Sequence, residues 1–148
     1  MRQKITSRGN EKIKRLRLLS KDSAFRKSEG EFVAEGPHLL EEALAERAPI
    51  TAVFVALDKP PEELLARLPA DIPVYMLPSD LLESVAPAQT TQGILFTCRM
   101  QTRKMATGGR YLLLDELADP GNVGTILRTA DAFAFDGVLL TAGSADVY

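Results

Sequence analysis

Short apolar runs alternate with stretches of helical periodicity along this chain, and no other feature constrains its fold as strongly. Four runs rich in β-branched and aromatic residues predict strands, at 32–34, 50–56, 74–77 and 94–98. Leucines at helical spacing lie between them, in stretches that begin at Gly36, Pro60 and Ser79. The first stretch predicts a helix with one apolar face, formed by Leu39, Leu40, Ala43 and Leu44. The alternation predicts one small α/β domain over residues 1–100.

The N-terminal segment carries an excess of positive charge on a predicted helix. Residues 1–30 contain ten basic and three acidic side chains, so this segment is +7 and the remainder −9 within a formal net charge of −2. Asn10 is placed to cap a helix in which Ile13, Leu16 and Leu19 recur at three-residue spacing. The cations therefore occupy the other faces of that helix.

This basic segment has two interpretations. Attached to an acidic body, it is the electrostatic footprint of an arm that binds nucleic-acid phosphates. The alternative is a solvated helix face with surplus lysines. On the first interpretation we expect five side chains to contact phosphate, namely Arg8, Lys12, Lys14, Arg15 and Arg17.

The chain offers few groups for metal or thiol chemistry. Its single cysteine, Cys98, lies in an apolar run and is expected to be a buried hydrophobic residue rather than a nucleophile. Its single histidine, His38, stands at the start of a predicted helix, where no cluster of ligands completes a metal site. No apolar run approaches the roughly 20 residues of a membrane helix, and the N-terminus is basic and polar, so we expect a soluble, cytoplasmic protein.

A second, shorter unit follows a basic linker at residues 101–110, which contains a glycine pair and lacks apolar periodicity. Apolar runs at 111–114 and 137–141 flank a predicted helix at 122–134, which describes one βαβ unit with two parallel strands. One face of this helix is expected to be buried. That face comprises Val123, Ile126, Leu127, Ala130, Phe133 and Ala134.

A polar loop at 115–121 joins the first of these strands to the helix, where open α/β sheets usually carry their active site. Asn122 either caps the helix or presents its amide to a ligand. Arg128 falls outside the apolar stripe, so it is either a surface arginine or a guanidinium free to bind phosphate in a bidentate manner. Gly121 and Gly124 alone make only a weak nucleotide-loop motif, and these residues by themselves name no reaction.

Two parts of the chain resemble one known family. Asp119-Pro120-Gly121-Asn122-Val123-Gly124, together with Arg128-Thr129-Ala130-Asp131-Ala132-Phe133, resembles the first motif of the SpoU (TrmH) branch of the trefoil-knotted methyltransferases. Other residues are similar to the substrate-binding domain of that family in order and spacing. They are Ile5-Thr6-Ser7, Asn10, Ile13-Lys14, 30–36, 42–44 and 91–93. The resemblance covers essentially the whole chain.

The resemblance implies an RNA-binding domain over residues 1–100 and, over 111–148, the start of a knotted parallel-sheet methyltransferase domain. It also implies transfer of a methyl group from S-adenosylmethionine to a ribose 2'-hydroxyl of ribosomal or transfer RNA. In the family the arginine matching Arg128 is the proposed base, and the asparagine matching Asn122 supports the same site. Because a guanidinium is protonated at neutral pH, we expect Arg128 to bind phosphate and stabilise the developing alkoxide more easily than to accept a proton.

The chain departs from the family pattern in two places. Ala134 stands where the family usually has glycine, a local change at the helix exit. The chain also stops at Tyr148, before the motifs that form the knot, bind S-adenosylmethionine and build the family's homodimer interface. We therefore expect residues 1–148 alone neither to bind cofactor nor to methylate, and we expect an exposed sheet surface with association or local disorder after residue 110.

Two other functions remain open from the residues alone. A non-catalytic RNA-binding module of the ribosomal-protein kind explains residues 1–100 equally well, but it leaves the motif at 122–128 unexplained. A Rossmann nucleotide-binding fragment predicts a glycine-rich turn directly after Leu114, where this chain has Asp115-Glu116-Leu117.

Overall fold

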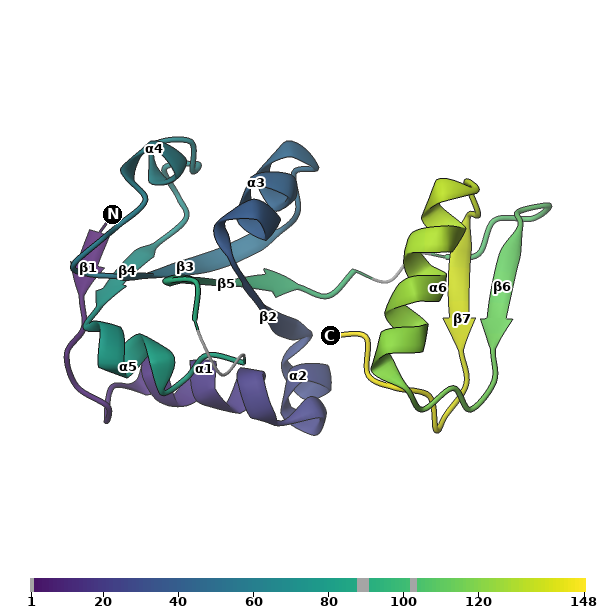
Figure 1. Ribbon diagram of the computed structural model, residues 1–148, viewed down its shortest axis with the longest axis horizontal. Helices are drawn as coiled ribbons and strands as arrows, with labels where there is room; N and C mark the ends of the chain where they lie inside the picture. Colours follow the sequence, from purple (N-terminus) through teal and green to yellow (C-terminus); the bar gives the residue numbers. More distant parts are fainter. Residues whose placement is uncertain (1, 88–90, 102–103) are drawn as a thin grey trace. The chain divides into compact units, whose positions relative to one another are not determined.

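The apolar runs of the N-terminal part build a five-stranded sheet in the computed structural model, which describes residues 2–87, 91–101 and 104–148 (Figure 1). Predictions that involve residues 88–90, which precede Gly93, and residues 102–103, in the predicted linker, lie outside the described residues. The chain divides into two units, Met1–Met100 and Gln101–Tyr148. The predicted α/β class is confirmed.

The sheet of the first unit is mixed, with the strand order β1-β4-β3-β5-β2. β1 and β3 both run parallel to β4, whereas β5 runs antiparallel to its neighbours β3 and β2. The strands are β1 (Arg2–Lys4), β2 (Glu31–Glu35), β3 (Ile50–Ala56), β4 (Val74–Leu77) and β5 (Ile94–Arg99). The sequence pattern predicts all of them except β1, whose three residues are polar and exposed.

Helices cover both faces of this sheet (Figure 1). On one face, α1 (Glu11–Lys21) and α5 (Ser79–Glu83) bury leucines in a core that also contains Phe54. On the other face, α3 (Pro37–Ala45) and α4 (Glu62–Leu65) bury leucines in a second core. Both faces of the central strands are therefore covered, as near-continuous apolar strands require.

α1 begins and packs as the sequence predicts. The Asn10 side chain accepts a hydrogen bond from the Lys12 amide at 2.9 Å, which caps the helix. Ile13, Leu16 and Leu19 are all buried, so the predicted apolar stripe of this helix is confirmed.

Two features of the flanking helices differ from the predictions. A separate helix, α2 (Ser23–Glu29), follows α1 without burying a single residue, so apolar periodicity gives no sign of it. Its start is set by Asp22, whose carboxylate accepts from the Phe25 amide at 3.0 Å. In α3, Leu40 is buried as predicted, but Leu39 is 48% exposed, so its assignment to the buried face is wrong.

The single cysteine and histidine lie as expected. Cys98 is buried on β5, and burial, reinforced by the charge of Glu31, raises the pKa of its thiol to about 11. The thiol is therefore protonated at neutral pH and is no nucleophile. His38 lies exposed on α3, with Nε2 3.2 Å from Glu42 Oε1. Among the described residues, no group of histidine, cysteine and acidic side chains is arranged to hold a metal ion.

The second unit is the predicted βαβ unit. β6 (Tyr111–Leu114) pairs in parallel with β7 (Gly137–Leu140), and α6 (Pro120–Ala132) connects them. Leu113 and Leu139 remain 66% and 36% exposed, so the expected exposed sheet surface is present. Within the described ranges of the chain, no helix is both long enough and apolar enough to span a bilayer.

The buried face of α6 is shorter than predicted. Val123 and Ala130 are buried, but Phe133 is 68% exposed and Ala134 is exposed as well, so their assignment to the buried face is wrong. The physical reason is that the helix ends at Ala132 and the backbone turns at Ala134, where φ is +52°. This left-handed conformation favours glycine, the residue that the resembling family usually has there.

The packing of α1 can be tested with two leucines of the same helix. Leu16→Ala should lower the free energy of unfolding by about 2–5 kcal/mol, because Leu16 is 1% exposed and its truncation leaves a cavity. Leu18→Ala, at a side chain that is 45% exposed, should change it by no more than about 0.5 kcal/mol. Urea denaturation followed by circular dichroism measures both. Equal losses would show that α1 does not dock through Leu16.

Candidate functional site

The loops that follow β6 and β7 are tied together at the carboxyl ends of the two parallel strands. The Thr141 hydroxyl donates to Asp115 Oδ1 at 2.7 Å and accepts from the Glu116 amide at 3.0 Å. These bonds hold Glu116 at a φ of +48°, a conformation that a non-glycine residue adopts only when its surroundings impose it.

Two further hydrogen bonds join the same two loops at Leu117. The Leu117 amide donates to the Ser144 hydroxyl at 3.2 Å, and the Ala145 amide donates to the Leu117 carbonyl at 2.9 Å. The segment after β6 is therefore fixed on the segment after β7. Sequence reasoning missed Thr141 and Ser144, because isolated hydroxyl residues after a strand carry no pattern that separates them from an ordinary loop.

The N-terminus of α6 opens directly from this loop. Asp119 caps the N-terminus of this helix, because its side-chain Oδ1 accepts a hydrogen bond from the backbone N–H of Asn122 at 2.6 Å. Pro120 occupies the first turn. The alternative that Asn122 itself caps the helix is therefore wrong. Asn122 lies exposed in the first turn, and the described part of the chain records no hydrogen bond of its side-chain amide.

Arg128 lies exposed on the same helix and reaches back toward its N-terminus. Its Nη2 is 3.3 Å from Thr125 Oγ1, and its Nη1 would lie 3.6 Å from a Cβ placed on Gly124. Long helical side chains lean toward the helix N-terminus, so the guanidinium lies along the turn that leads to Asn122. Gly124 leaves the surface over which it lies free of a side chain.

These groups suit an anionic ligand that also carries a hydroxyl. The first turn of α6 has the partial positive charge of a helix N-terminus, and Arg128 adds a full charge with a planar fork of donors. Asn122 offers both a donor and an acceptor. Asn122 and Arg128, both predicted as site residues, thus lie on one helix, Asn122 in its first turn and Arg128 past its middle, although no contact between them is recorded among the described side chains.

The cations predicted to contact phosphate divide into two kinds. Arg15 is held between carboxylates, since its guanidinium donates to Glu29 and to the buried Glu31. Burial alone lowers the pKa of Arg15, but the hydrogen bonds to Glu29 and Glu31 outweigh it and raise the pKa above its ordinary value. A phosphate would therefore compete with two acids for Arg15.

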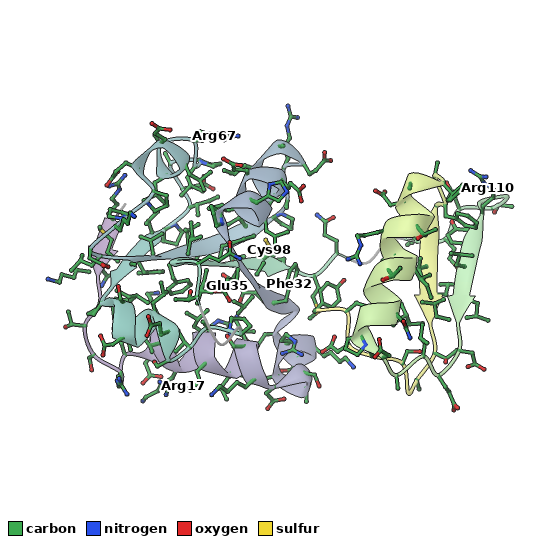
Figure 2. The ribbon with its side chains drawn as sticks, in the orientation of Figure 1. Arg17, Phe32, Glu35, Arg67, Cys98 and Arg110 are labelled. Atoms are coloured by element: carbon green, nitrogen blue, oxygen red, sulfur yellow. The ribbon has the colours of Figure 1, made fainter. Side chains whose placement is uncertain are left out.

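Of the other four cations, Arg8, Lys12 and Lys14 are exposed and Arg17 is half-buried. Lys14 pairs with the exposed Glu11 at 2.8 Å, and Arg8 approaches Asp80 at 3.3 Å, in ion pairs that solvent screens. Lys12 lies over the Tyr75 ring. Arg17 projects from the outer side of α1, and Arg67 lies beside α4 on the opposite face of the sheet (Figure 2).

Two family models match the chain, one on each unit. Residues 10–95 match the MRM3-like substrate binding domain, and residues 109–148 match the SpoU rRNA Methylase family. A 23S rRNA (guanosine(2553)-2'-O)-methyltransferase of Bacillus subtilis, RlmP, is 37% identical over 97% of this chain and 56% of its own length.

Solved structures agree with these matches. An rRNA methyltransferase from Sinorhizobium meliloti superposes with a TM-score of 0.81 at 26% identity, over 98% of this chain and 57% of that one. A second structure, described as an AdoMet-bound rRNA methyltransferase of the same organism, gives a TM-score of 0.80 at 26% identity, over 98% and 56% of the two chains. The chain therefore spans little more than half the length of the relatives it matches.

The tie between the two loops can be tested by removing one hydroxyl. Thr141→Val deletes the acceptor of the Glu116 amide, so hydrogen exchange of that amide should accelerate on the order of tenfold. Thr129→Val is the matched control, because the Thr129 hydroxyl bonds only within α6, to the Thr125 carbonyl. Unchanged protection of Glu116 in Thr141→Val would show that other contacts hold the loop.

Proposed function

The chain belongs to the SpoU rRNA methylase family and contains an MRM3-like substrate binding domain, and from this premise we propose that it forms part of an rRNA ribose methyltransferase. The proposed reaction transfers the methyl group of S-adenosylmethionine to a ribose 2'-hydroxyl. The observation that supports it most is the exposure of Asn122 and Arg128 on α6, a helix that begins in the loop at the carboxyl end of one of two parallel strands.

The difficulty of this reaction lies in the nucleophile. A ribose hydroxyl attacks poorly unless its proton leaves and negative charge on its oxygen is stabilised. Arg128 carries a positive charge that can hold a phosphate of the RNA beside the reacting ribose and stabilise the alkoxide as it forms. The exposed amide of Asn122 is positioned to orient the same ribose by hydrogen bonding.

S-adenosylmethionine supplies an electrophilic methyl group. The described residues around the N-terminus of α6 are mainly hydroxyl, carboxylate, amide and guanidinium groups, from Asp115, Glu116, Asn122, Thr125, Arg128, Thr141 and Ser144. Such a set fits a ribose phosphate, whereas an adenosine group needs apolar walls. We therefore assign no cofactor contact to the described residues.

The two units take different parts in this proposal. Residues 1–100 bind the RNA, the basic linker joins them to the reaction centre, and residues 111–148 open the methyl-transfer domain. Arg8, Lys12, Lys14 and Arg17 are the proposed phosphate contacts, whereas Arg15, which donates to Glu29 and Glu31, is proposed to keep Glu31 in place. The exposed Leu113 and Leu139 are apolar positions that further elements of a parallel sheet would cover. We further propose that the whole enzyme is a cytoplasmic homodimer and that transfer RNA is the alternative substrate.

The role of Arg128 predicts a large loss of activity upon substitution. Arg128→Ala, in a chain carried on to the length of its relatives, should lower methyl transfer on the order of a hundredfold or more, because a charge that stabilises the transition state is lost. Arg128→Lys should lose less, since it keeps the charge but not the planar fork. The measurement is transfer of label from S-adenosylmethionine to total ribosomal and transfer RNA.

The control for this experiment is Lys104→Ala, which removes an exposed cation from the same unit. It should leave methyl transfer within a few fold of the starting protein, and circular dichroism should show that both variants fold. Full activity of Arg128→Ala would overturn the role of Arg128. RNA binding without methyl transfer in any form would favour a non-catalytic RNA-binding module.

The basic face of α1 predicts a change in salt dependence. Lys14 and Arg17 are one helical turn apart, so Lys14→Ala/Arg17→Ala should weaken RNA binding and flatten the slope of log affinity against log salt by roughly 0.7–0.9 per lost phosphate contact. Filter binding of structured ribosomal RNA at several salt concentrations measures it. The control, Lys59→Ala/Arg67→Ala, removes the same charge around α4, and an equal change in slope would contradict the assignment to α1.

A further inference from the structure

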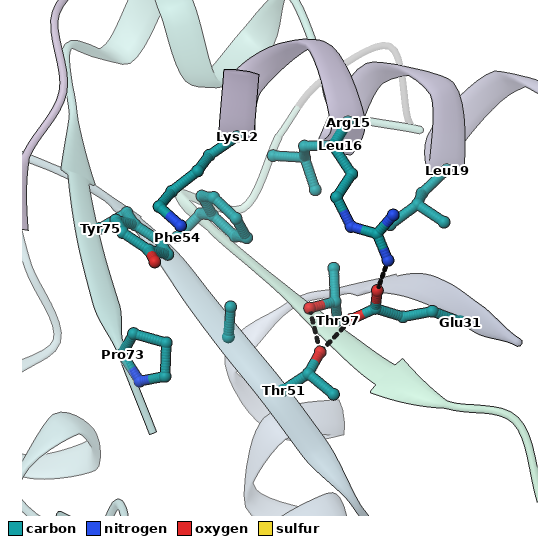
Figure 3. Close-up of a pocket in the computed structure, with 11 residues that line it drawn as sticks. Lys12, Arg15, Leu16, Leu19, Glu31, Thr51, Phe54, Pro73, Tyr75 and Thr97 are labelled. Atoms are coloured by element: carbon teal, nitrogen blue, oxygen red, sulfur yellow. Dashed lines mark hydrogen bonds and ion pairs between the residues drawn. The ribbon is translucent and has the colours of Figure 1, made fainter. Parts of the chain in front are cut away.

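A cavity of about 240 Å³ lies between α1 and the sheet of the first unit (Figure 3). Its lining includes charged, hydroxyl and aromatic side chains, namely Lys12, Arg15, Glu31, Thr51, Tyr75 and Thr97. It lies near the amino ends of β3 and β4 and shares no residue with the Asn122 and Arg128 site. It is smaller than the roughly 300–1,000 Å³ of pockets for drug-sized ligands, so its size suits a single ring system.

An aromatic surface forms one part of this cavity. Tyr75 on β4 and Phe54 on β3 lie side by side with ring centroids 5.0 Å apart. The Lys12 ammonium lies 4.9 Å from the centroid of the Tyr75 ring, as Figure 3 illustrates. Lys12 is exposed, and the described residues provide it with no acidic partner, so it can leave the ring for a phosphate. The stacking of a base on an aromatic ring is stronger than an exposed contact of this kind.

A polar surface forms another part of the cavity wall. The Glu31 carboxylate accepts from the Arg15 guanidinium and from the Thr51 hydroxyl, and the Thr51 and Thr97 hydroxyls are 2.6 Å apart. Glu31 and Thr97 are only 8% and 4% exposed. The network is therefore held in place by β2, β3 and β5 and offers hydroxyl and carboxylate oxygens at a fixed position.

A β-bulge brings Thr51 into this network. Ile50 pairs with Cys98 and Ala52 pairs with Thr97, so Thr51 is the extra residue of β3. As a result, Thr51 and Ala52 both line the cavity, although consecutive residues of a regular strand point to opposite faces. Bulges commonly re-aim a side chain next to a functional site.

From these observations we propose that the cavity binds one unpaired nucleobase of the RNA substrate, an inference that rests on the proposed function. The base stacks on Tyr75, its edge meets Thr97 and Glu31, and Lys12 moves to the adjoining phosphate. Arg15 stays with Glu31 and closes one side. Recognition of an unpaired base by aromatic stacking and by hydrogen bonds to its edge is the usual way in which proteins read RNA sequence.

The carboxylate sets the kind of base that fits. Glu31 is an acceptor, so it favours a base that presents an exocyclic amino group, as adenine, guanine and cytosine do. Uracil presents carbonyl oxygens on either side of its single N–H, and these face the carboxylate unfavourably.

The test is a titration of the whole chain with ribonucleoside 5'-monophosphates, followed by amide chemical shifts. AMP, GMP and CMP at millimolar concentrations should shift the amides of Thr51, Tyr75 and Thr97, with UMP binding several-fold more weakly. Ribose 5-phosphate, which lacks a base, should not shift them. Thr97→Val, which removes one hydroxyl at nearly constant volume, should weaken nucleotide binding several-fold, whereas Thr6→Val, at an exposed position outside the cavity, should not.

Failure of the proposed base site can be distinguished from failure of the proposed function. Equal shifts with ribose 5-phosphate, no shifts at these amides with any nucleotide, or unchanged binding in a folded Thr97→Val would each overturn the base site. RNA affinity, its salt dependence along α1 and methyl transfer would keep the proposed function standing in all three cases. Preferential binding of a peptide in place of the nucleotides would also overturn the base site and assign the cavity to a protein partner.

Discussion

The packing of the apolar stripe of α1 against the sheet decides where the N-terminal positive charge can act. Because Ile13, Leu16 and Leu19 must face the core, the cations between them are confined to the edges and outer surface of the helix. Lys12 and Arg15, three residues apart, fall on the edge that borders the cavity. Hydrophobic burial thus divides the cations of this segment between the proposed phosphate-binding surface and the border of the proposed base site.

One buried carboxylate, that of Glu31, further restricts where these cations can act. Arg15 faces Glu31, whose side chain is held from its other side by Thr51, and the bulge in β3 supplies that threonine. A buried acid paired in this way costs stability if its partner leaves, so Arg15 stays in place. Lys12 has no such restraint, and the same edge of α1 therefore combines a fixed cation with a movable one.

A helix or strand can be predicted from the sequence where its own residues show a periodic apolar pattern. It cannot be predicted where it forms only because a residue or strand elsewhere in the chain pairs with it or caps it. The apolar pattern predicts the strands at Ile50–Ala56 and Val74–Leu77 and the buried stripe of α1. β1 exists because it pairs with β4, which is about seventy residues away, and α2 depends on the cap at Asp22 rather than on burial. In the candidate site, a family motif predicts Asn122 and Arg128. The role of Thr141 cannot be predicted in this way, because its hydroxyl reaches the Glu116 amide only when β6 and β7 lie side by side.

The two units are held by different physical means. In the first, two apolar cores flank the sheet, whereas only Val123 and Ala130 are buried apolar residues among those described beyond residue 103. The ordering of the second unit therefore depends on its hydrogen bonds, from Thr141, Ser144 and the Asp119 cap. Hydrogen bonds exposed to water contribute little net stability each, so a loop held this way adjusts at low cost when a ligand arrives. The proposed reaction centre would therefore adapt to a flexible ribose at low cost, whereas two apolar cores hold the sheet of the first unit in place.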